Sequence, residues 1–124
     1  MLSRNTLILI AAGLFLTGGL GQWYFTKTRG SCRERVPGAR VEIYTKSTCI
    51  FCRKAKDLLK AKNISFEEYE ITNCPKIREE MIQRSNNRHT VPQIFIHGIH
   101  VGGYEDLRIL DKSGKINQLL EIIK

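Results

Sequence analysis

The sequence predicts an α/β domain over residues 41–124, with a mixed four-stranded sheet flanked by helices and preceded by one N-terminal hydrophobic helix. Strand-like and helix-like patterns alternate in the first half of this domain, which indicates a parallel βαβ unit. Two short apolar runs then follow each other across Gly98, which indicates an antiparallel hairpin. The last residues carry apolar side chains at helical spacing. One sheet with helices on both faces accounts for all three patterns.

The first half of the domain begins with alternating apolar and polar residues at 41–45, which predict a strand. Ser47 and Thr48 favour the start of a helix, and apolar side chains at helical spacing continue to Asn63, which can end it. Residues 64–71 alternate again and predict a second strand, with its first apolar side chains facing inward.

The second half contains the hairpin and three more helices. Pro75 suits the first turn of a helix that opens at Cys74, because the missing N–H has no partner there in any case, and the polar residues 85–87 end this helix. The remaining predicted elements are a strand at 93–97, a strand at 99–101, a helix beginning near Tyr104 after two glycines, and a helix at 115–123.

Residues 6–25 form an uncharged, mostly apolar segment. A helix of about 20 residues spans about 30 Å, the thickness of a bilayer's hydrocarbon core. The segment ends in the aromatic residues 23–25 and is followed by cations, a flank typical of a membrane anchor. We therefore expect a transmembrane anchor at 1–25. A signal peptide is the alternative, with Gly19 and Gly21 as small residues near a cleavage point.

Residues 26–40 are rich in cations and have no periodicity, so they predict a basic tether. Of the net charge of +8, the first 40 residues supply most, with six Lys and Arg against one Glu. The domain itself has no basic run with interleaved aromatic residues, which argues against nucleic-acid binding. More cations follow the apolar span than precede it, which favours a single-pass anchor with the domain facing the cytoplasm. A periplasmic or other extracytoplasmic location is the alternative.

Cys49 and Cys52 form a C-x-x-C motif at the junction of a predicted strand and a predicted helix. The positive end of the helix favours a thiolate over a thiol, and Lys46 adds a nearby cation. We expect Cys49 to be the nucleophile and Cys52 to attack the mixed disulfide formed at Cys49. Such a motif in a βαβ unit indicates a thioredoxin-like redox site.

Other uses of the cysteines have weaker support. Structural zinc needs four ligands, and the remaining cysteines and histidines are scattered, so we expect no metal. A purely structural Cys49–Cys52 disulfide would close almost no loop. Cys74 is interpreted as a helix-start thiol. Cys32 is interpreted as an unpaired thiol in the tether, with palmitoylation or an intermolecular disulfide as alternatives.

Four stretches together resemble one known family: VEIYTKSTCIFCRKAKDLL (41–59), KIREEMIQRS (76–85), TVPQIFI (90–96) and HVGGYEDL (100–107). They are similar to bacterial dithiol glutaredoxins of the thioredoxin-like superfamily and cover nearly all of the domain. The resemblance implies a thioredoxin-like fold, a cis-proline in the third stretch and a glutathione-binding turn in the fourth. It also implies a glutathione-dependent oxidoreductase that reduces glutathione mixed disulfides and protein disulfides, with glutathione as the reductant.

The resemblance implies a role for each residue of a glutathione site. Cys49 would take up the glutathionyl sulfur, and Cys52 would resolve protein disulfides. The implied binding positions are Lys46 at the glycyl carboxylate, Phe51 beside the tripeptide, Val91 and Pro92 along its backbone, Gly103 at a close backbone approach, and Glu105 and Asp106 at the γ-glutamyl end.

One departure from the family leaves alternatives open. Many dithiol members have Pro-Tyr between the cysteines, whereas this chain has Ile50 and Phe51, which changes the surroundings of the thiolate. A glutathione-ligated iron–sulfur dimer and an extracytoplasmic thiol oxidant or isomerase are the alternative functions. We expect a monomeric domain whose partners are glutathione and glutathionylated or disulfide-bonded proteins, with no nucleic acid.

Overall fold

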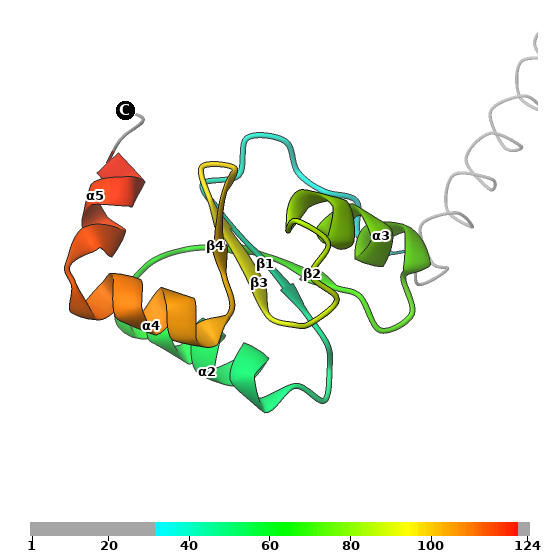
Figure 1. Ribbon diagram of the computed structural model, residues 1–124, viewed down its shortest axis with the longest axis horizontal. Coiled ribbons are helices and arrows are strands. Elements are labelled where there is room, and N and C mark those ends of the chain that lie inside the picture. The colour runs from blue at the N-terminus through cyan, green and yellow to red at the C-terminus, as the bar shows by residue number, and fades with distance from the viewer. Residues whose placement is uncertain (1–31, 122–124) are drawn as a thin grey trace, which may run out of the picture. The chain divides into compact units, whose positions relative to one another are not determined.

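The computed structural model describes residues 32–121 of the chain (Figure 1). No helix in this range is long and apolar enough to cross a bilayer. The predicted membrane span at 6–25 lies outside the described residues. The elements in chain order are β1 (Val41–Thr45), α2 (Ile50–Ala61), β2 (Glu67–Glu70), α3 (Pro75–Arg84), β3 (Gln93–Ile96), β4 (Ile99–Gly102), α4 (Tyr104–Lys112) and α5 (Lys115–Glu121).

The four strands form one mixed sheet in the order β2–β1–β3–β4. β1 pairs in parallel with β2 and antiparallel with β3, and β4 pairs antiparallel with β3. The connection from β1 to β2 runs through α2, so this part of the chain is the expected βαβ unit. The predicted mixed four-stranded sheet and its hairpin are confirmed.

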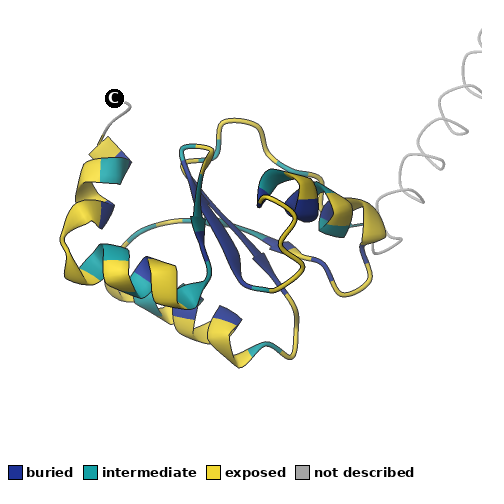
Figure 2. Ribbon diagram, viewed as in Figure 1, coloured by how far each residue is buried: buried dark blue, intermediate teal, exposed yellow. Residues whose placement is uncertain are grey.

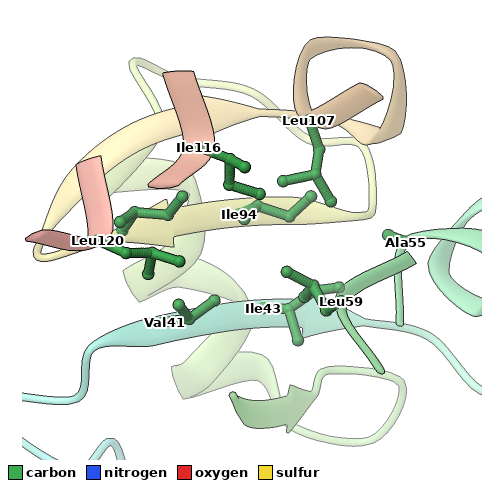
Figure 3. Close-up of a cluster of buried hydrophobic side chains, with 9 residues drawn as sticks. Val41, Ile43, Ala55, Leu59, Ile94, Leu107, Ile116 and Leu120 are labelled. Atoms are coloured by element: carbon green, nitrogen blue, oxygen red, sulfur yellow. The ribbon is translucent and has the colours of Figure 1, made fainter. Parts of the chain in front are cut away.

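Helices cover both faces of the sheet. Successive residues of a strand point to opposite faces, so the central strands have buried side chains on both. On β1, Ile43 packs into a cluster with α2, α4 and α5, whereas Tyr44 packs into a second cluster with α3. Figure 2 shows the central strands β1 and β3, which are buried throughout, in dark blue, and the exposed side of each helix in yellow. The first cluster, drawn in Figure 3, contains Val41, Ile43, Ala55, Leu59, Ile94, Ile96, Leu107, Ile116 and Leu120.

The start of α2 differs from the prediction. The N-cap residue is Cys49 rather than Ser47 or Thr48, and its Sγ accepts a hydrogen bond from the backbone N–H of Cys52 at 3.1 Å. The predicted end is confirmed: Asn63 follows the C-cap with φ of 58°, a left-handed conformation that asparagine tolerates.

The second strand is shorter than the alternation at 64–71 predicts, since β2 comprises only Glu67–Glu70. Ile64 and Phe66 precede it and pack against the first cluster. The alternation at Ile64 and Phe66 therefore reflects the burial of their side chains, although neither residue pairs with β1.

Residues 33–40, called the strap below, contact the domain. Arg33 forms an ion pair with Glu67, and its guanidinium lies 5.7 Å from the centre of the Tyr69 ring. The backbone N–H of Val36 donates to the Tyr69 hydroxyl at 2.8 Å. This part of the predicted tether therefore lies against β2, while its first residues lie outside the described range.

Candidate active site

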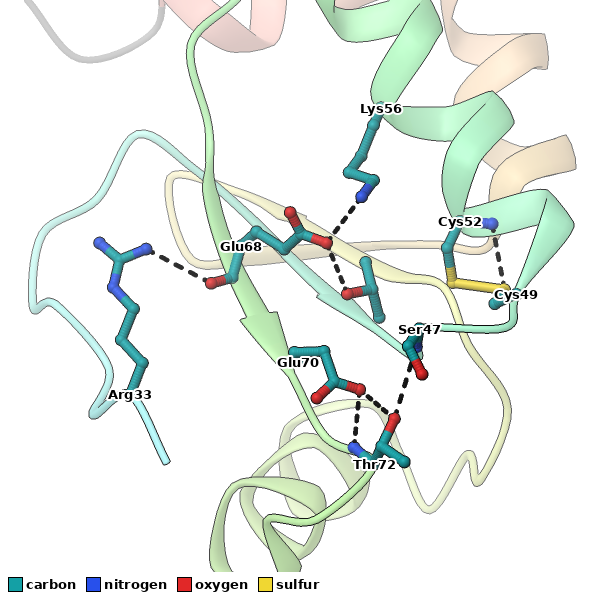
Figure 4. Close-up of polar contacts among 9 residues, drawn as sticks. Arg33, Ser47, Cys49, Cys52, Lys56, Glu68, Glu70 and Thr72 are labelled. Carbon is teal, nitrogen blue, oxygen red and sulfur yellow. Dashed lines mark hydrogen bonds and ion pairs between the residues drawn. A yellow bond between two sulfur atoms is a disulfide. The ribbon is translucent and has the colours of Figure 1, made fainter. Parts of the chain in front are cut away.

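Cys49 and Cys52 are joined by a disulfide, with their Cα atoms 5.2 Å apart (Figure 4). Cys49 is partly exposed at the N-cap of α2, whereas Cys52 is only 1% exposed in the first turn. The first turn of α2 contains no acidic residue. A thiolate on Cys49 would therefore accept backbone N–H groups at the positive end of the helix, as a nucleophilic cysteine requires.

A groove of about 260 Å³ begins beside Cys49. The Cys49 sulfur lies 3.7 Å from the backbone oxygen of Val91, and the Val91–Pro92 peptide bond is cis, as the family resemblance implied. The residues lining the groove come from the start of α2, the loop before β3, the first residue of β3 and the start of α4. They are Phe51, Arg88, Thr90, Val91, Pro92, Gln93, Gly103, Tyr104, Glu105 and Asp106.

The far end of the groove is the N-terminus of α4. Asp106 Oδ2 accepts the backbone N–H of Gly103 at 2.9 Å, which caps this helix. Glu105 accepts a hydrogen bond from Arg108 at 2.9 Å. Both predicted acids thus lie in the groove, and each already has a partner within the chain.

Six of the seven predicted glutathione-binding residues line the groove, and Lys46 does not. Lys46 is exposed in the turn before α2, where its backbone oxygen accepts the N–H of Cys49 at 3.2 Å. Its role at the glycyl carboxylate therefore stays a prediction. Arg88 lines the groove and was not predicted, although its position just before the Thr-Val-Pro stretch was a usable signal.

Two aromatic rings stand at the mouth of the groove. The rings of Phe51 and Tyr104 have their centres 6.0 Å apart, and Phe51 is 54% exposed. Together with the neighbouring Ile50, which is 67% exposed, Phe51 leaves an apolar surface uncovered beside the groove. Tyr104 was not predicted as a site residue, although it directly follows Gly103 in the 100–107 stretch.

Gln93 supports the floor of the groove from inside the sheet. Its amide donates to the backbone oxygen of Thr90 at 3.0 Å, and its Oε1 lies 2.7 Å from Nε2 of His100. Burial, together with the charge of Arg88, lowers the pKa of His100. The neutral imidazole therefore donates a hydrogen bond from its Nε2–H to Gln93 Oε1 at neutral pH, which orients the Gln93 amide nitrogen toward Thr90.

The turn before Cys49 is bound to the end of β2. The backbone N–H of Ile71 donates to Thr45 at 2.9 Å, and the N–H of Ser47 donates to the Thr72 hydroxyl at 3.4 Å (Figure 4). Glu68 accepts hydrogen bonds from Thr45 and Lys56, each at 2.8 Å. These contacts join β1, α2 and β2 directly beneath the reactive cysteine.

The interpretation of Cys32 as an unpaired thiol is wrong. Cys32 forms a disulfide with Cys74, and their Cα atoms lie 5.4 Å apart. Cys74 is the N-cap residue of α3, so its predicted place at a helix start is confirmed. The strap carries Cys32 to α3, a path that no local pattern in the sequence indicates.

Between residues 32 and 121, no three histidine, cysteine or acidic side chains are grouped so that they could hold a metal ion.

Known proteins show strong similarity to this chain. The glutaredoxin family model matches residues 41–101. Glutaredoxin 3 of Escherichia coli strain K12 is 53% identical over 83 residues, which are 67% of this chain and 99% of that protein. The solution structure of a glutaredoxin from Brucella melitensis is 42% identical, with a TM-score of 0.59 over 71% of this chain and 95% of that one. A dithiolic glutaredoxin from Trypanosoma brucei brucei is 34% identical, with a TM-score of 0.61 over 68% of this chain and 89% of that one.

The sheet order, the N-capping Cys49 and the groove beside the cis-proline agree with these similarities, and the Escherichia coli relative is matched over nearly its full length. The chain therefore belongs to the glutaredoxin family of thioredoxin-like, glutathione-dependent thiol–disulfide oxidoreductases.

Proposed function

We propose that this chain acts by a dithiol mechanism in which Cys49 is the nucleophile and Cys52 the resolving thiol. The observation that carries the proposal is the contrast between them: Cys49 caps α2 beside the groove, and Cys52 is buried one turn later. A solvent-accessible thiolate at a helix N-terminus attacks first, and the buried thiol reacts only with the sulfur next to it.

Two substrates follow from this arrangement. With a glutathione mixed disulfide, the Cys49 thiolate attacks the glutathione sulfur, and the other thiol leaves and takes up a proton. A second glutathione thiolate then attacks the Cys49–glutathione bond, which releases oxidised glutathione and restores the Cys49 thiolate. With a protein disulfide, the Cys49 thiolate attacks one substrate sulfur, which forms a mixed disulfide and releases the first substrate thiol. Cys52 then attacks Cys49 Sγ, which forms the Cys49–Cys52 disulfide and releases the second substrate thiol. Two glutathione molecules then reduce the Cys49–Cys52 disulfide.

The groove provides the positions for the tripeptide of glutathione. The backbone of Val91, next to Cys49, would pair with the cysteinyl backbone as an added strand would. The N-terminus of α4, with Gly103, Glu105 and Asp106, would receive the charged γ-glutamyl end. Lys46 would bind the glycyl carboxylate, because Arg88 lies at the γ-glutamyl end, 3.6 Å from Asp106.

The test is glutathione-dependent reduction of a small mixed disulfide by the wild-type chain and by Cys49→Ser and Cys52→Ser. We expect Cys49→Ser to fall to the background rate and Cys52→Ser to keep activity with this substrate while losing protein-disulfide reduction. Cys32→Ser is a matched control, because it removes a cysteine outside the groove and should leave the rate unchanged at temperatures well below its own melting temperature. Full activity in Cys49→Ser would refute the mechanism.

We further propose that residues 6–25 anchor the protein as a single membrane pass, with the monomeric catalytic domain facing the cytoplasm. The apolar length of the segment and the cations after it support this proposal. A protease added to cells whose outer membrane or wall has been opened should leave a C-terminal tag uncut until the inner membrane is permeabilised as well. Cleavage of the tag while the inner membrane is still intact would place the catalytic domain outside the cytoplasm.

One observation favours the second candidate, an extracytoplasmic thiol oxidant or isomerase. Disulfides such as Cys32–Cys74 persist mainly in oxidising compartments. On that side of the membrane, the Cys49–Cys52 disulfide would be passed to substrate thiols instead of being reduced by glutathione. The protease experiment distinguishes the two candidates.

A further inference from the structure

The Cys32–Cys74 disulfide, like the active-site disulfide, includes the N-cap residue of a helix, although here the N-cap sulfur is the buried one. Cys49 caps α2 after β1, and Cys74 caps α3 after β2, the parallel neighbour of β1. In each pair one sulfur is largely buried and the other is reachable: Cys74 is 8% exposed, and Cys32 is partly exposed. Both pairs therefore combine an accessible sulfur with a helix N-terminus.

We propose that Cys32 and Cys74 form a second thiol–disulfide couple that glutathione opens and closes, with Cys32 as the site of glutathionylation. The proposal goes beyond the proposed function, because neither Cys49 nor Cys52 takes part in it.

Exposure determines which sulfur is attacked. Both cysteines contact the cluster beneath α3, but Cys32 is only partly buried against it, whereas Cys74 is one of its buried members. A glutathione thiolate therefore reaches Cys32 more easily than Cys74. The new bond joins the glutathione sulfur to Cys32 Sγ, the Cys32–Cys74 bond breaks, and Cys74 leaves as a thiolate. A second glutathione then attacks the adduct, which releases oxidised glutathione and a Cys32 thiolate that takes up a proton.

The position of Cys74 makes it a good leaving group. A thiolate leaves faster when its negative charge is stabilised, and the N-terminus of a helix carries a positive partial charge. The first turn of α3 contains no acidic residue and includes Lys76 and Arg78. The Cys74 side chain accepts no capping hydrogen bond in the disulfide form, so the N–H groups of this first turn are free of a side-chain cap and can receive the thiolate.

The strap favours closing of the couple again. After opening, Arg33 still has its ion pair with Glu67 and its hydrogen bond to the Glu68 carbonyl at 3.4 Å, and Val36 still binds Tyr69. These contacts keep Cys32 near α3, so the effective concentration of a Cys32 adduct at the Cys74 thiolate is high. When oxidised glutathione puts an adduct on Cys32, Cys74 attacks that adduct, expels glutathione and restores the disulfide.

The experiment uses the full-length chain with Cys49→Ser and Cys52→Ser, so that Cys32 and Cys74 are the only cysteines. The protein is equilibrated in buffers of reduced and oxidised glutathione, the free thiols are blocked, and the peptides that contain each cysteine are identified by mass spectrometry. We expect a reversible transition from disulfide to dithiol, with roughly tenfold more glutathione adduct on Cys32 than on Cys74. Adding Cys74→Ser should increase the Cys32 adduct, because the thiol that removes it is gone.

Two results would overturn the proposal: a Cys32–Cys74 disulfide that stays closed in reduced glutathione alone, or an adduct that forms mainly on Cys74. Mapping the same peptides from the wild-type chain gives the same information if the double variant does not fold. The result does not depend on oxidoreductase activity, since Cys49 and Cys52 are either absent or mapped separately.

Discussion

At the scale of single residues, the far end of the groove depends on a glycine with an unusual conformation. Gly102 has φ of 121°, and a Cβ built there would lie 2.3 Å from Oδ2 of Asp106. That same oxygen caps α4 through the N–H of Gly103. The conformation of Gly102, the cap of α4 and the far end of the groove therefore all depend on the position of the Asp106 carboxylate.

We predict that Gly102→Ala destabilises the domain by about 1–3 kcal/mol, because the methyl group forces both a strained φ and a displacement of Asp106. The KM for glutathione should rise as well, since the displaced carboxylate belongs to the groove. Thermal unfolding and steady-state kinetics measure the two effects. Gly98→Ala is the matched control: Gly98 also has a positive φ, 77°, but no atom lies within 4 Å of the added Cβ. Gly98→Ala should lower stability and leave KM unchanged.

Residues close in sequence to a motif could be located before the structure was known. Cys49, Phe51, Val91 and Pro92 lie within short stretches whose spacing is itself the signal, and the structure brings them together. Arg88 reaches the same groove, but a single arginine before a motif has many possible uses. A motif predicts its own members well and its spatial neighbours poorly.

At the scale of elements, Glu68 is the side chain that joins β2 to α2. Burial alone would raise the pKa of Glu68, but hydrogen bonds from Lys56 and Thr45 and the charge of Lys56 outweigh that effect and lower it. The folded protein therefore binds the ionised carboxylate in preference to the protonated acid. This preference contributes to stability only while Glu68 is ionised.

We predict that this contribution is fully present above the ordinary glutamate pKa of about 4.3 and is lost as the pH falls through the lower pKa of the folded state. The free energy of unfolding of the wild type should therefore exceed that of Glu68→Gln most clearly at pH 6–7, and the difference should shrink at pH 3–4. Denaturant unfolding at several pH values measures it. Glu34→Gln controls for the loss of one surface charge, and a constant difference across this pH range would contradict the prediction.

The elements also show what hydrophobic patterns report. The alternation at 64–71 predicted one strand, yet only residues 67–70 pair with β1. Ile64 and Phe66 satisfy the same alternation by packing on the first cluster from an extended segment. An alternating pattern predicts which side chains are buried, but it does not predict which residues form backbone hydrogen bonds with a neighbouring strand.

At the scale of the whole molecule, the two disulfides differ in the length of chain that they close. Cys32 and Cys74 are 42 residues apart and enclose β1, α2 and β2, whereas Cys49 and Cys52 are 3 apart. No local pattern could predict the longer link, because it depends on where the strap runs after the sheet has formed. Its physical effect also belongs to the whole chain, since it restricts the unfolded state.

We predict that Cys32→Ser lowers the free energy of unfolding of the oxidised protein by about 3–4 kcal/mol, the loop entropy of a link of this length. For a domain of this size the melting temperature should fall by roughly 15 °C. The strap contacts of Arg33 and Val36 remain in the variant, so the loss comes from the freer unfolded chain. A reductant opens both links, so it should bring the wild type close to the melting temperature of the reduced variant and lower that of the variant only slightly. Cys49→Ser with Cys52→Ser, which opens only the short link, should lose much less. Equal melting of the oxidised wild type and Cys32→Ser would show that the longer link does not constrain the chain.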